Sequence, residues 1–375
     1  MDPLWLVLPG LCIWLTILAL PWRPWSTSES LDATVTDTAT DLGDITILIP
    51  ARNEARHIIS TLNSLSGQGR RHRIILIDDD SNDATAALAA SLHLSNLDII
   101  RGRPLAPGWS GKLWALEQGR LLATGKYLLL LDADISLTPG LLPALLAKRQ
   151  QENLHFLSLM AYLRMESGWE KMLMPAFIYF FKLLYPFRLS NSTSRLVAAA
   201  AGGCILIDRQ VLDDVGGFSA VKGQLIDDCA LARQVKNHGC KTWIGLTHSV
   251  LSQRCYDDLQ TVWDMVARTA FTQLRYSYLL LGVCTLLMLS AFALPVAGLL
   301  SGQPTAFTLA CLAILIMLTT YIPTLEYYRL NLLWACTLPL TGLLYLGMTW
   351  GSAINHWRGK GASWKGRSYN SPSPE

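Results

Sequence analysis

The chain has 375 residues, of which 51% are hydrophobic and only 16% are charged, and its formal net charge at pH 7 is +3. This composition is too apolar for an average soluble protein and favours attachment to a membrane. The small net charge, without a basic stripe that carries interleaved aromatic residues, argues against nucleic acid as a partner.

Apolar stretches mark both ends of the chain. Four of them lack Asp, Glu, Lys and Arg and have about the length that crosses a bilayer, namely residues 3–22, 278–300, 305–325 and 332–354. No Lys or Arg precedes the first stretch and no small-residue cleavage site is clear, so we expect an uncleaved anchor over 1–25. Residues 26–44 are rich in Ser, Thr and Asp, which predicts a flexible linker.

The folded part of the chain begins after this linker. Short apolar, β-branched runs, which we predict to be strands, occur at 45–49, 74–77, 97–100 and 127–131, with helix-like stretches between them. Strands and helices that alternate at this spacing predict an α/β fold with a parallel, doubly wound sheet. The eight cysteines include no Cys-x-x-Cys pair, which suits a reduced cytosolic domain without structural zinc.

Asp132 and Asp134 follow the fourth predicted strand, one residue apart. One interpretation is a strand that ends at a solvated turn. The other is a metal site, because two neighbouring carboxylates repel each other and a hard divalent cation can bridge them to substrate phosphates. The motif alone leaves both interpretations open.

Polar residues also follow the first two strands. Pro50 to Glu54 follow the first strand, and an acidic run at 78–83 follows the second. Helix capping by residues 81–83 explains part of this pattern. Since parallel strands end at the same edge, where open α/β sheets bind ligands, the three polar groups together favour a binding site.

A glycine-containing loop at 107–112 precedes a predicted helix at 113–123. Lys112 stands at the start of this helix, where main-chain N–H groups and a cation suit a phosphate. The loop lacks the spacing of a Walker phosphate loop.

The second half of the chain carries weaker signals. Residues 172–187 are apolar and aromatic but contain Pro175 and Lys182, so they are too short and broken to span a membrane. We weigh a buried helix of the folded domain against a helix at the membrane interface, and favour the interface. Residues 202–207 predict a further strand, and 263–278 an amphipathic segment that leads into the second apolar stretch.

Asp227 and Asp228 begin a predicted helix that Gly239 ends. Two acidic residues in a first turn are explained by the helix dipole alone. A catalytic carboxylate is the alternative interpretation.

Taken in order, these motifs resemble the family 2 glycosyltransferases, which have the GT-A fold, a Rossmann-like α/β fold that binds nucleotide-diphospho-sugars. The resemblance covers about residues 45–276. Within that family the chain is most similar to the membrane-bound hopanoid-biosynthesis-associated glycosyltransferases, in the run Gly-Trp-Ser-Gly-Lys-Leu-Trp-Ala-Leu at 108–116 and in the tail from His356 to Arg367.

The resemblance implies a role for each matching residue. It places Pro50, Ala51, Arg52 and Glu54 beside the base and ribose, Asp79 on the uracil, Lys112 and Asp132 at the diphosphate, Asp134 with Asp132 on Mg²⁺ or Mn²⁺, and Asp228 as the catalytic base. Asp227 stands where the family usually has Glu. The implied reaction is an inverting sugar transfer from a nucleotide-diphospho-sugar, with UDP as the expected nucleotide, to a hydroxyl of a lipid acceptor such as a hopanoid or another isoprenoid.

Two alternatives differ in the reaction. A processive polysaccharide synthase of the same family is disfavoured because residues 273–276 have one residue too few for the Gln-x-x-Arg-Trp motif and end in Tyr. A haloacid-dehalogenase-type phosphatase, with Asp132 as nucleophile, would need the strand at 127–131 to be the first of its sheet.

The expected organisation is an anchor, a linker, a catalytic domain at 45–253, an interfacial segment at 254–277, membrane helices at 278–354 and a basic tail at 355–375. The expected location is the bacterial inner membrane, with several crossings and a cytosolic catalytic domain. Four crossings would place the tail outside, whereas its four basic residues, Arg358, Lys360, Lys365 and Arg367, favour the cytosol by the positive-inside rule.

Overall fold

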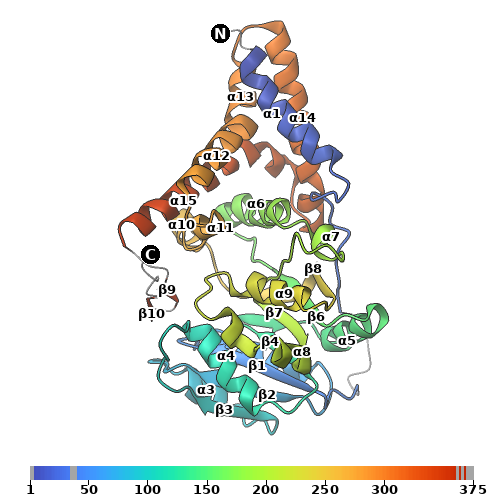
Figure 1. The fold of residues 1–375 in the computed structure, drawn as a ribbon, viewed down its shortest axis with the longest axis vertical. Helices are drawn as coiled ribbons and strands as arrows, with labels where there is room; N and C mark the ends of the chain where they lie inside the picture. Colours follow the sequence, from blue (N-terminus) through green and yellow to red (C-terminus); the bar gives the residue numbers. More distant parts are fainter. Residues whose placement is uncertain (1–3, 34–39, 360–362, 365–366, 369–375) are drawn as a thin grey trace. The chain divides into compact units, whose positions relative to one another are not determined.

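The structure is a computed structural model that describes residues 4–33, 40–359, 363–364 and 367–368. Its described residues form two compact units, which we call the sheet unit (within 29–164, 189–254 and 363–375) and the helical unit (within 1–28, 165–188 and 255–362). Each unit is built from segments that are distant in the sequence (Figure 1).

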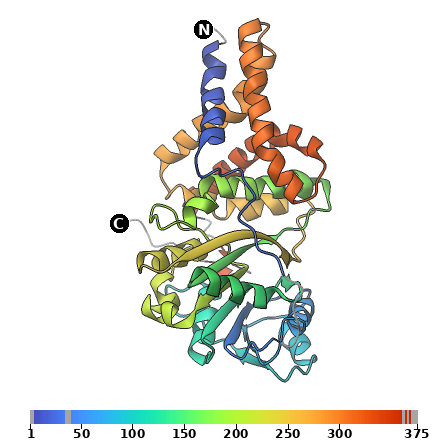
Figure 2. The same cartoon turned by 90° about the vertical axis from the view of Figure 1, so that its right-hand side faces the viewer.

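The sheet unit contains one large sheet with helices on both faces (Figures 1 and 2). Its strands are β1 (Ile45–Ala51), β2 (Arg73–Asp78), β3 (Leu97–Arg101), β4 (Tyr127–Leu131), β5 (Ile135–Leu137), β6 (Phe156–Tyr162), β7 (Cys204–Asp208) and β8 (Thr242–Ser252). Its helices are α2 (Ile58–Ser66), α3 (Thr85–Ala90), α4 (Gly111–Leu122), α5 (Leu141–Glu152), α8 (Arg209–Asp214), a 3₁₀ turn at Gly217–Val221 and α9 (Asp227–Asn237). A short hairpin, β9 (Ser363–Trp364) and β10 (Arg367–Ser368), completes the described part.

The strand order is β3-β2-β1-β4-β7-β6-β8-β5. The first four strands predicted from the sequence are present and mutually parallel, and the further strand predicted at 202–207 is present as β7. The prediction of a wholly parallel sheet is wrong, because β7 runs antiparallel to both β4 and β6, and β5 antiparallel to β8. The sheet is therefore mixed, and the start of β7 lies beside the end of β4.

Alternation of side chains along the buried strands supplies both faces of the sheet with core residues. In β1, Ile45, Ile47 and Ile49 pack on the face covered by α2 and α5, and Leu48 packs on the face covered by α4 and α9. This packing fixes the register of β1, so the residues that follow it emerge at one edge.

The predicted linker at 26–44 is partly attached to the sheet unit. Ser30 pairs with Leu246 of β8, and Asp41 pairs with Arg70. The prediction of a flexible linker is wrong for these residues.

The helical unit is built from apolar helices. They are α1 (Leu4–Ala19), α6 (Gly168–Leu184), α10 (Leu259–Ala267), α11 (Ala270–Gln273), α12 (Tyr278–Met288), a π-helical turn at Leu289–Ala293, α13 (Leu294–Leu299), α14 (Pro304–Tyr327), a 3₁₀ turn at Leu332–Thr337 and α15 (Leu338–Trp357); the short α7 (Phe187–Ser190) begins in this unit and ends in the sheet unit. Among the described residues, three continuous segments are long and apolar enough to cross a membrane, Tyr278–Leu299, Pro304–Tyr327 and Leu332–Trp357. The expected N-terminal anchor has only 16 helical residues, about 24 Å at 1.5 Å per residue, which is shorter than a bilayer core.

Helix α6 covers the segment expected at 172–187. It belongs to the helical unit, and its aromatic residues pack inside that unit. Tyr179 bonds Thr320 of α14 at 2.9 Å, and the ring of Phe180 contacts Tyr345 of α15 at 5.0 Å between centroids.

Candidate active site

The loops after β1 and β2 are joined by hydrogen bonds. The main-chain N–H of Asn53 donates to Ser81 Oγ at 3.0 Å, the N–H of Ala55 donates to Asp83 Oδ2 at 3.1 Å, and the N–H of Asn82 donates to Asn53 Oδ1 at 2.8 Å. Helix α3 has no side-chain bond from its N-cap residue, although Asp83 also accepts the N–H of Thr85. Residues 81–83 therefore fix the position of the loop after β1. The helix-capping interpretation of these residues did not predict this role.

Five of the expected nucleotide contacts lie in or between these loops. Pro50 and Ala51 end β1, and the N–H of Asp79 donates to Ala51 O at 2.8 Å. Arg52 donates to the main-chain oxygens of Asp79 and Asp80. Glu54 and Asp79 are buried, with 7% and 2% of each residue exposed. The structure thus brings Pro50, Ala51, Arg52, Glu54 and Asp79 together at the carboxyl edge of β1 and β2.

Asp132 emerges from β4 at the same edge. Because β7 is antiparallel to β4, the glycines before β7 meet it there, and the N–H of Asp132 donates to Gly203 O at 3.1 Å. Lys112, in the first turn of α4, reaches both strands: its ammonium lies 2.6 Å from Asp132 Oδ1 and donates to Gly202 O at 3.2 Å.

Asp134 is held by a residue that the sequence did not single out. Arg254 Nη2 lies 3.0 Å from Asp134 Oδ2 and 3.7 Å from Glu54 Oε1. Arg254 follows β8, whose end pairs with the start of β5, directly after Asp134. Since the sequence predicted neither β5 nor β8, the arrival of Arg254 at this edge could not be foreseen.

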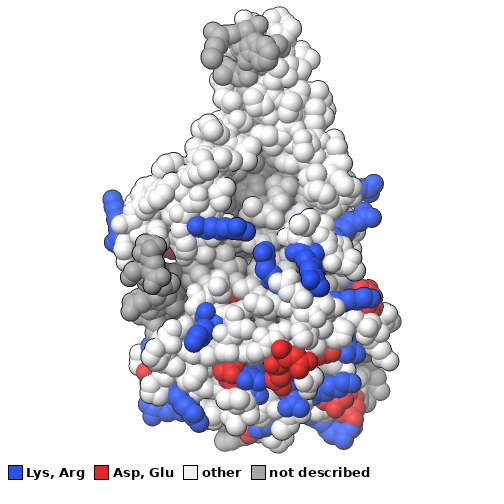
Figure 3. Space-filling model, in the orientation of Figure 1, with Lys and Arg blue, Asp and Glu red and all other residues white. Residues whose placement is uncertain are grey.

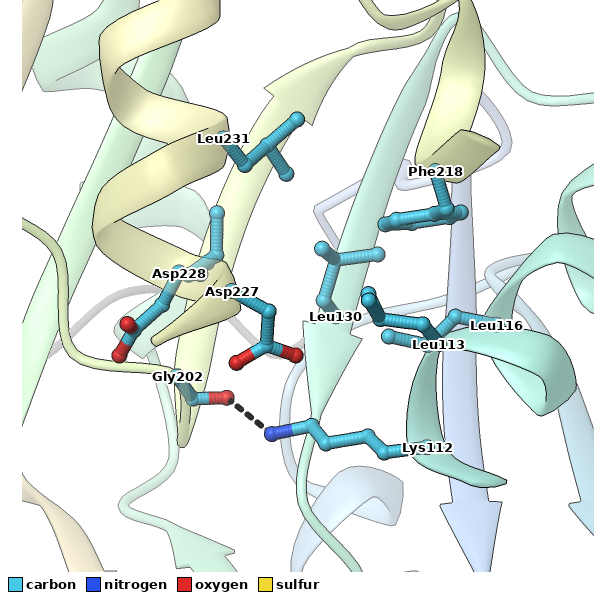
Figure 4. Close-up of a pocket in the computed structure, with 10 residues that line it drawn as sticks. Lys112, Leu113, Leu116, Leu130, Gly202, Phe218, Asp227, Asp228 and Leu231 are labelled. Atoms are coloured by element: carbon cyan, nitrogen blue, oxygen red, sulfur yellow. Dashed lines mark hydrogen bonds between the residues drawn. The ribbon is translucent and has the colours of Figure 1, made fainter. Parts of the chain in front are cut away.

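Asp227 and Asp228 start helix α9 beside the same glycine. A methyl group placed on Gly202 would lie 3.3 Å from Asp228 Oδ2 and 3.2 Å from Lys112 Nζ, so both groups flank this residue. Figure 4 shows the carboxylate of Asp227 on the side of Lys112 and that of Asp228 turned away from it. Although Asp227 and Asp228 follow β7 in the sequence, the start of α9 places this acid pair at the sheet edge where β4 ends.

A cavity of about 20 Å³ lies between these groups and the core of the sheet unit. Its wall combines Lys112, Gly202 and the acid pair with apolar side chains, namely Leu113, Leu116, Leu130, Ile205, Phe218 and Leu231 (Figure 4). This volume holds about one water and is far too small for a sugar. The cavity is therefore an inner boundary of the site and does not hold the donor.

Burial and charge shift the acid–base properties of the cluster. Burial raises the pKa of Asp228, the charge of Asp227 raises it further, and hydrogen bonds from the N–H groups of Cys229 and Gly202 oppose the rise, so that it reaches about 7. Burial lowers the pKa of Lys112, but the carboxylates of Asp132 and Asp227 outweigh this and raise it, so the ammonium stays protonated. The cluster therefore combines a permanent cation with a carboxyl group that ionises near neutral pH.

The donor set fits a hard divalent cation that is bound mainly through phosphate. No group of three or more His, Cys, Asp and Glu side chains suited to a metal occurs in the part of the chain that the structure describes. Mg²⁺ commonly takes only one or two protein carboxylates, with waters and substrate phosphates completing its ligands, and Asp132 and Asp134 supply that number. Each of them is paired with a cation, Lys112 or Arg254, so a metal ion would compete with these pairs.

Comparison with known proteins agrees with this architecture. Residues 46–216 match the model of the family described as Glycosyl transferase family 2. This stretch, a little under half of the chain, is therefore similar to the family 2 glycosyltransferase domain. The matched residues include Asp79, Lys112, Asp132 and Asp134 but end before Asp227 and Asp228.

The chain is similar over a short stretch to two proteins that are named as glycosyltransferases. The chain is 36% identical over 93 residues to the 4,4'-diaponeurosporenoate glycosyltransferase of Staphylococcus haemolyticus (strain JCSC1435), which covers 25% of this chain and 24% of the relative. The protein of the same name from Staphylococcus aureus (strain MRSA252) is also 36% identical over 93 residues, and 24% of each chain is covered. The chain thus spans about a quarter of the length of these curated relatives.

One solved structure is similar over nearly the whole chain. A mannosyltransferase from Pyrobaculum calidifontis, in complex with GDP-Man and Mn²⁺, superposes with a TM-score of 0.54 at 15% sequence identity, covering 95% of both chains. At this identity the similarity shows the fold alone. The expected GT-A fold, accompanied by helices of transmembrane length, is confirmed.

Proposed function

We propose that the protein transfers a sugar from a nucleotide-diphospho-sugar to a lipid acceptor, with inversion at the anomeric carbon. The observation that carries this proposal is the convergence of Lys112, Asp132 and the acid pair Asp227–Asp228 around Gly202, at the sheet edge of the stretch that is similar to the family 2 glycosyltransferases. This edge brings a cation for a leaving diphosphate close to a carboxyl group that can accept a proton.

Asp228 is the proposed general base. Its pKa of about 7 lies near the working pH, where a carboxylate removes a proton most effectively from an acceptor hydroxyl. As the hydroxyl oxygen bonds to the anomeric carbon, the bond from that carbon to the diphosphate oxygen breaks on the opposite face. The proton ends on Asp228, and the electron pair leaves with the nucleoside diphosphate.

The donor is proposed to lie along the loops after β1 and β2. Pro50, Ala51, Arg52, Glu54 and Asp79 would contact the base and ribose, with uracil as the expected base because Asp79 can accept its N–H group. Lys112 would stabilise the negative charge of the departing diphosphate. Mg²⁺ or Mn²⁺, held through Asp134 and Asp132, would supply further positive charge to the same diphosphate when bound.

The acceptor class rests on two observations. Three segments of the helical unit could cross a membrane, which is consistent with a membrane-associated enzyme and a lipid substrate. The Staphylococcus relatives are named for a carotenoid acid, 4,4'-diaponeurosporenoate. We therefore propose an isoprenoid-type lipid, of which a hopanoid is one candidate, as the acceptor in a bacterial inner membrane.

The relatives' name also supports a second candidate, transfer to a carboxylate of a carotenoid-like acid. A carboxylate is ionised at neutral pH and needs no base, so the two acceptors place different demands on Asp228. With a carboxylate acceptor, loss of Asp228 should lower the rate far less than with a hydroxyl acceptor.

Purified full-length protein, incubated with UDP- and GDP-sugars, a divalent cation and isoprenoid alcohols or acids, tests the proposal. We expect release of nucleoside diphosphate that depends on one lipid class, and a product that carries a single sugar. A product ladder would instead indicate a polysaccharide synthase, and release of phosphate from phosphoesters without sugar transfer would indicate a phosphatase. Failure of every sugar and lipid to support transfer would contradict the proposal.

A further inference from the structure

Helices α12 and α15, which belong to two of the segments long enough to cross a membrane, lie antiparallel against each other. Trp357, the last residue of α15, stacks on Tyr278, the first residue of α12, with ring centroids 5.5 Å apart. Two turns further along α12, Thr285 Oγ1 accepts the indole N–H of Trp350 at 3.0 Å. The end of α15 and the start of α12 therefore form one shared end within the helical unit.

Five aromatic side chains gather at this shared end, and we call them the aromatic cluster. Tyr276 stacks on His356 with ring centroids 4.5 Å apart, and the buried ring of Phe271 makes edge contacts with both of them, with Tyr278 and with Trp357. The exposed fractions of Tyr276, Tyr278 and Trp357 are 42%, 66% and 44%. Partly exposed tyrosine and tryptophan rings at the end of a membrane helix are typical of the level of the lipid headgroups.

The turn between α11 and α12 has an unfavourable backbone conformation. Arg275 and Tyr276 have φ of 51° and 55°, in the left-handed region, which costs about 1–3 kcal/mol for each residue other than glycine. The turn is held in place because the N–H of Phe271 donates to Ser352 Oγ of α15 at 3.0 Å, and the N–H of Tyr276 donates to Phe271 O at 3.1 Å. These contacts fix a turn that leaves Arg275 exposed at the shared end. Conformations of this kind are frequent where a protein holds a ligand.

Two arginines border the aromatic cluster, one on each helix. Arg275 stands three residues before Tyr278, Arg358 directly follows α15, and both are exposed. No Asp or Glu occurs in residues 265–325 or 327–374, so the segments that carry these arginines supply no carboxylate to neutralise them. Figure 3 shows no charged side chain on the visible surface over α13, which continues α12. The positive charge is therefore placed at the shared end and not along the helices.

An exposed apolar row begins in the first turn of α12. Leu279, Val283 and Leu286 are four and three residues apart, so they lie on one face of the helix, and they are 77%, 43% and 68% exposed. A ligand at the shared end thus meets positive charge on one side and aliphatic side chains along the helix. An anionic phospholipid has both a phosphate and acyl chains, whereas free phosphate would gain nothing from the apolar row.

We propose that the shared end of α12 and α15 is a binding site for one anionic phospholipid. Arg275 and Arg358 donate hydrogen bonds to the oxygens of the headgroup phosphate, and the exposed rings of the aromatic cluster pack against the glycerol part of the lipid. The acyl chains lie along the apolar row of α12. Every residue of this site belongs to the helical unit, so the proposal does not rest on the proposed sugar transfer.

Native mass spectrometry of the full-length protein tests the proposal. The protein in detergent is titrated with phosphatidylglycerol or with phosphatidylcholine of the same acyl chains, and the first bound lipid is quantified. We expect wild type to prefer phosphatidylglycerol, and Arg275→Gln/Arg358→Gln to bind it about 30-fold more weakly, the usual contribution of two basic residues near an anionic surface. The control Arg195→Gln/Arg233→Gln removes the same charge from exposed positions of the sheet unit and should bind like wild type.

Three results would overturn the proposal. Wild type could bind both lipids equally, which would show that the site does not select an anionic headgroup. The variant Arg275→Gln/Arg358→Gln could keep wild-type affinity for phosphatidylglycerol. The control variant could lose as much affinity as this variant, which would show that net charge and not a defined site attracts the lipid.

Photocrosslinking locates the bound lipid independently. The full-length protein is placed in phosphatidylcholine vesicles that contain a phosphatidylglycerol with a diazirine near the start of one acyl chain, and the crosslinked peptides are mapped after illumination. We expect crosslinks within residues 279–286 of α12 in wild type and in the control variant, and their loss in Arg275→Gln/Arg358→Gln. Crosslinks that persist in this variant, or that fall only on other parts of the chain in wild type, would overturn the proposal.

Discussion

The charge of Asp227 should set the pH at which the enzyme becomes active. Asp227 is the largest contribution after burial to the raised pKa of Asp228, and its carboxylate is one residue away on the same helix start. Asp227→Asn removes this charge with almost no change in shape. The pKa of Asp228 should therefore fall, and because a general base must be deprotonated, the acid limb of the rate profile should move to lower pH.

The size of the effect follows from the pKa of about 7. At pH 6 a group with that pKa is about 9% deprotonated, whereas a pKa lower by about one unit gives about 50%. The variant should then be roughly fivefold faster than wild type at pH 6, relative to each enzyme's own plateau at high pH. A weaker base is also a poorer proton acceptor, so the plateau itself should fall somewhat.

The assay is kcat/KM for sugar transfer between pH 5 and 9, with Asp214→Asn as the matched control. Asp214 lies exposed on α8, where it accepts a hydrogen bond from Gln210, and its replacement should leave the limb near pH 7. If the acid limb of the rate profile stays at the same pH in Asp227→Asn, or moves to higher pH, the charge of Asp227 does not raise the pKa of Asp228, and the reasoning is refuted.

Three further results are expected. Asp134→Ala should weaken binding of the UDP-sugar severely when Mn²⁺ is present, measured by calorimetry, and wild-type affinity would remove Asp134 from the metal site. Arg254→Met should tighten binding of Mn²⁺ without nucleotide about fivefold, since a partly exposed pair with Asp134 is worth up to about 1 kcal/mol, and weaker binding would show that Arg254 does not compete with the ion. Phe180→Ser should lower the thermal midpoint, because the ring pairs with Phe292 and Tyr345 are worth about 0.5–1.5 kcal/mol each; unchanged stability with selective loss of lipid transfer would instead favour a lipid-contact role.

The first four strands could be predicted because apolar residues predominate in each short run, although Asp98 interrupts the third. The strands β6 and β8 could not, because Ser158 interrupts the first and Gly245, Thr247 and Ser249 interrupt the second. Their place in the sheet depends on pairing between segments far apart in the sequence. For that reason the strand at 202–207 was predicted, but its antiparallel direction and its place between β4 and β6, and hence the mixed sheet, were not.

The acidic half of the site was more predictable than its basic half. Asp132, Asp134 and Asp228 each stand at the end of a strand or the start of a helix, where the local pattern draws attention to them. Arg254 follows a strand that was not predicted, and no local pattern distinguishes it from other arginines. Lys112 was assigned to a phosphate from its position at a helix start, and its contact with Asp132 required the β4–β7 pairing.

The three C-terminal segments of membrane-spanning length could be predicted from length and composition. The stretch at 332–354 has the composition of a spanning helix, and its structural counterpart Leu332–Trp357 has the length of one. Its stacking on Tyr276 and Tyr278 is a long-range contact that periodicity does not reveal.

The most direct test of the account is the Asp228→Asn variant of the full-length enzyme, assayed for binding and for transfer with the same nucleotide sugar and a hydroxyl acceptor. The account predicts wild-type binding of the donor and a loss of about 10²–10⁴ in the rate of transfer, the usual contribution of a positioned general base. A variant that keeps more than about a tenth of wild-type turnover with that acceptor would contradict the assignment of Asp228 as the base.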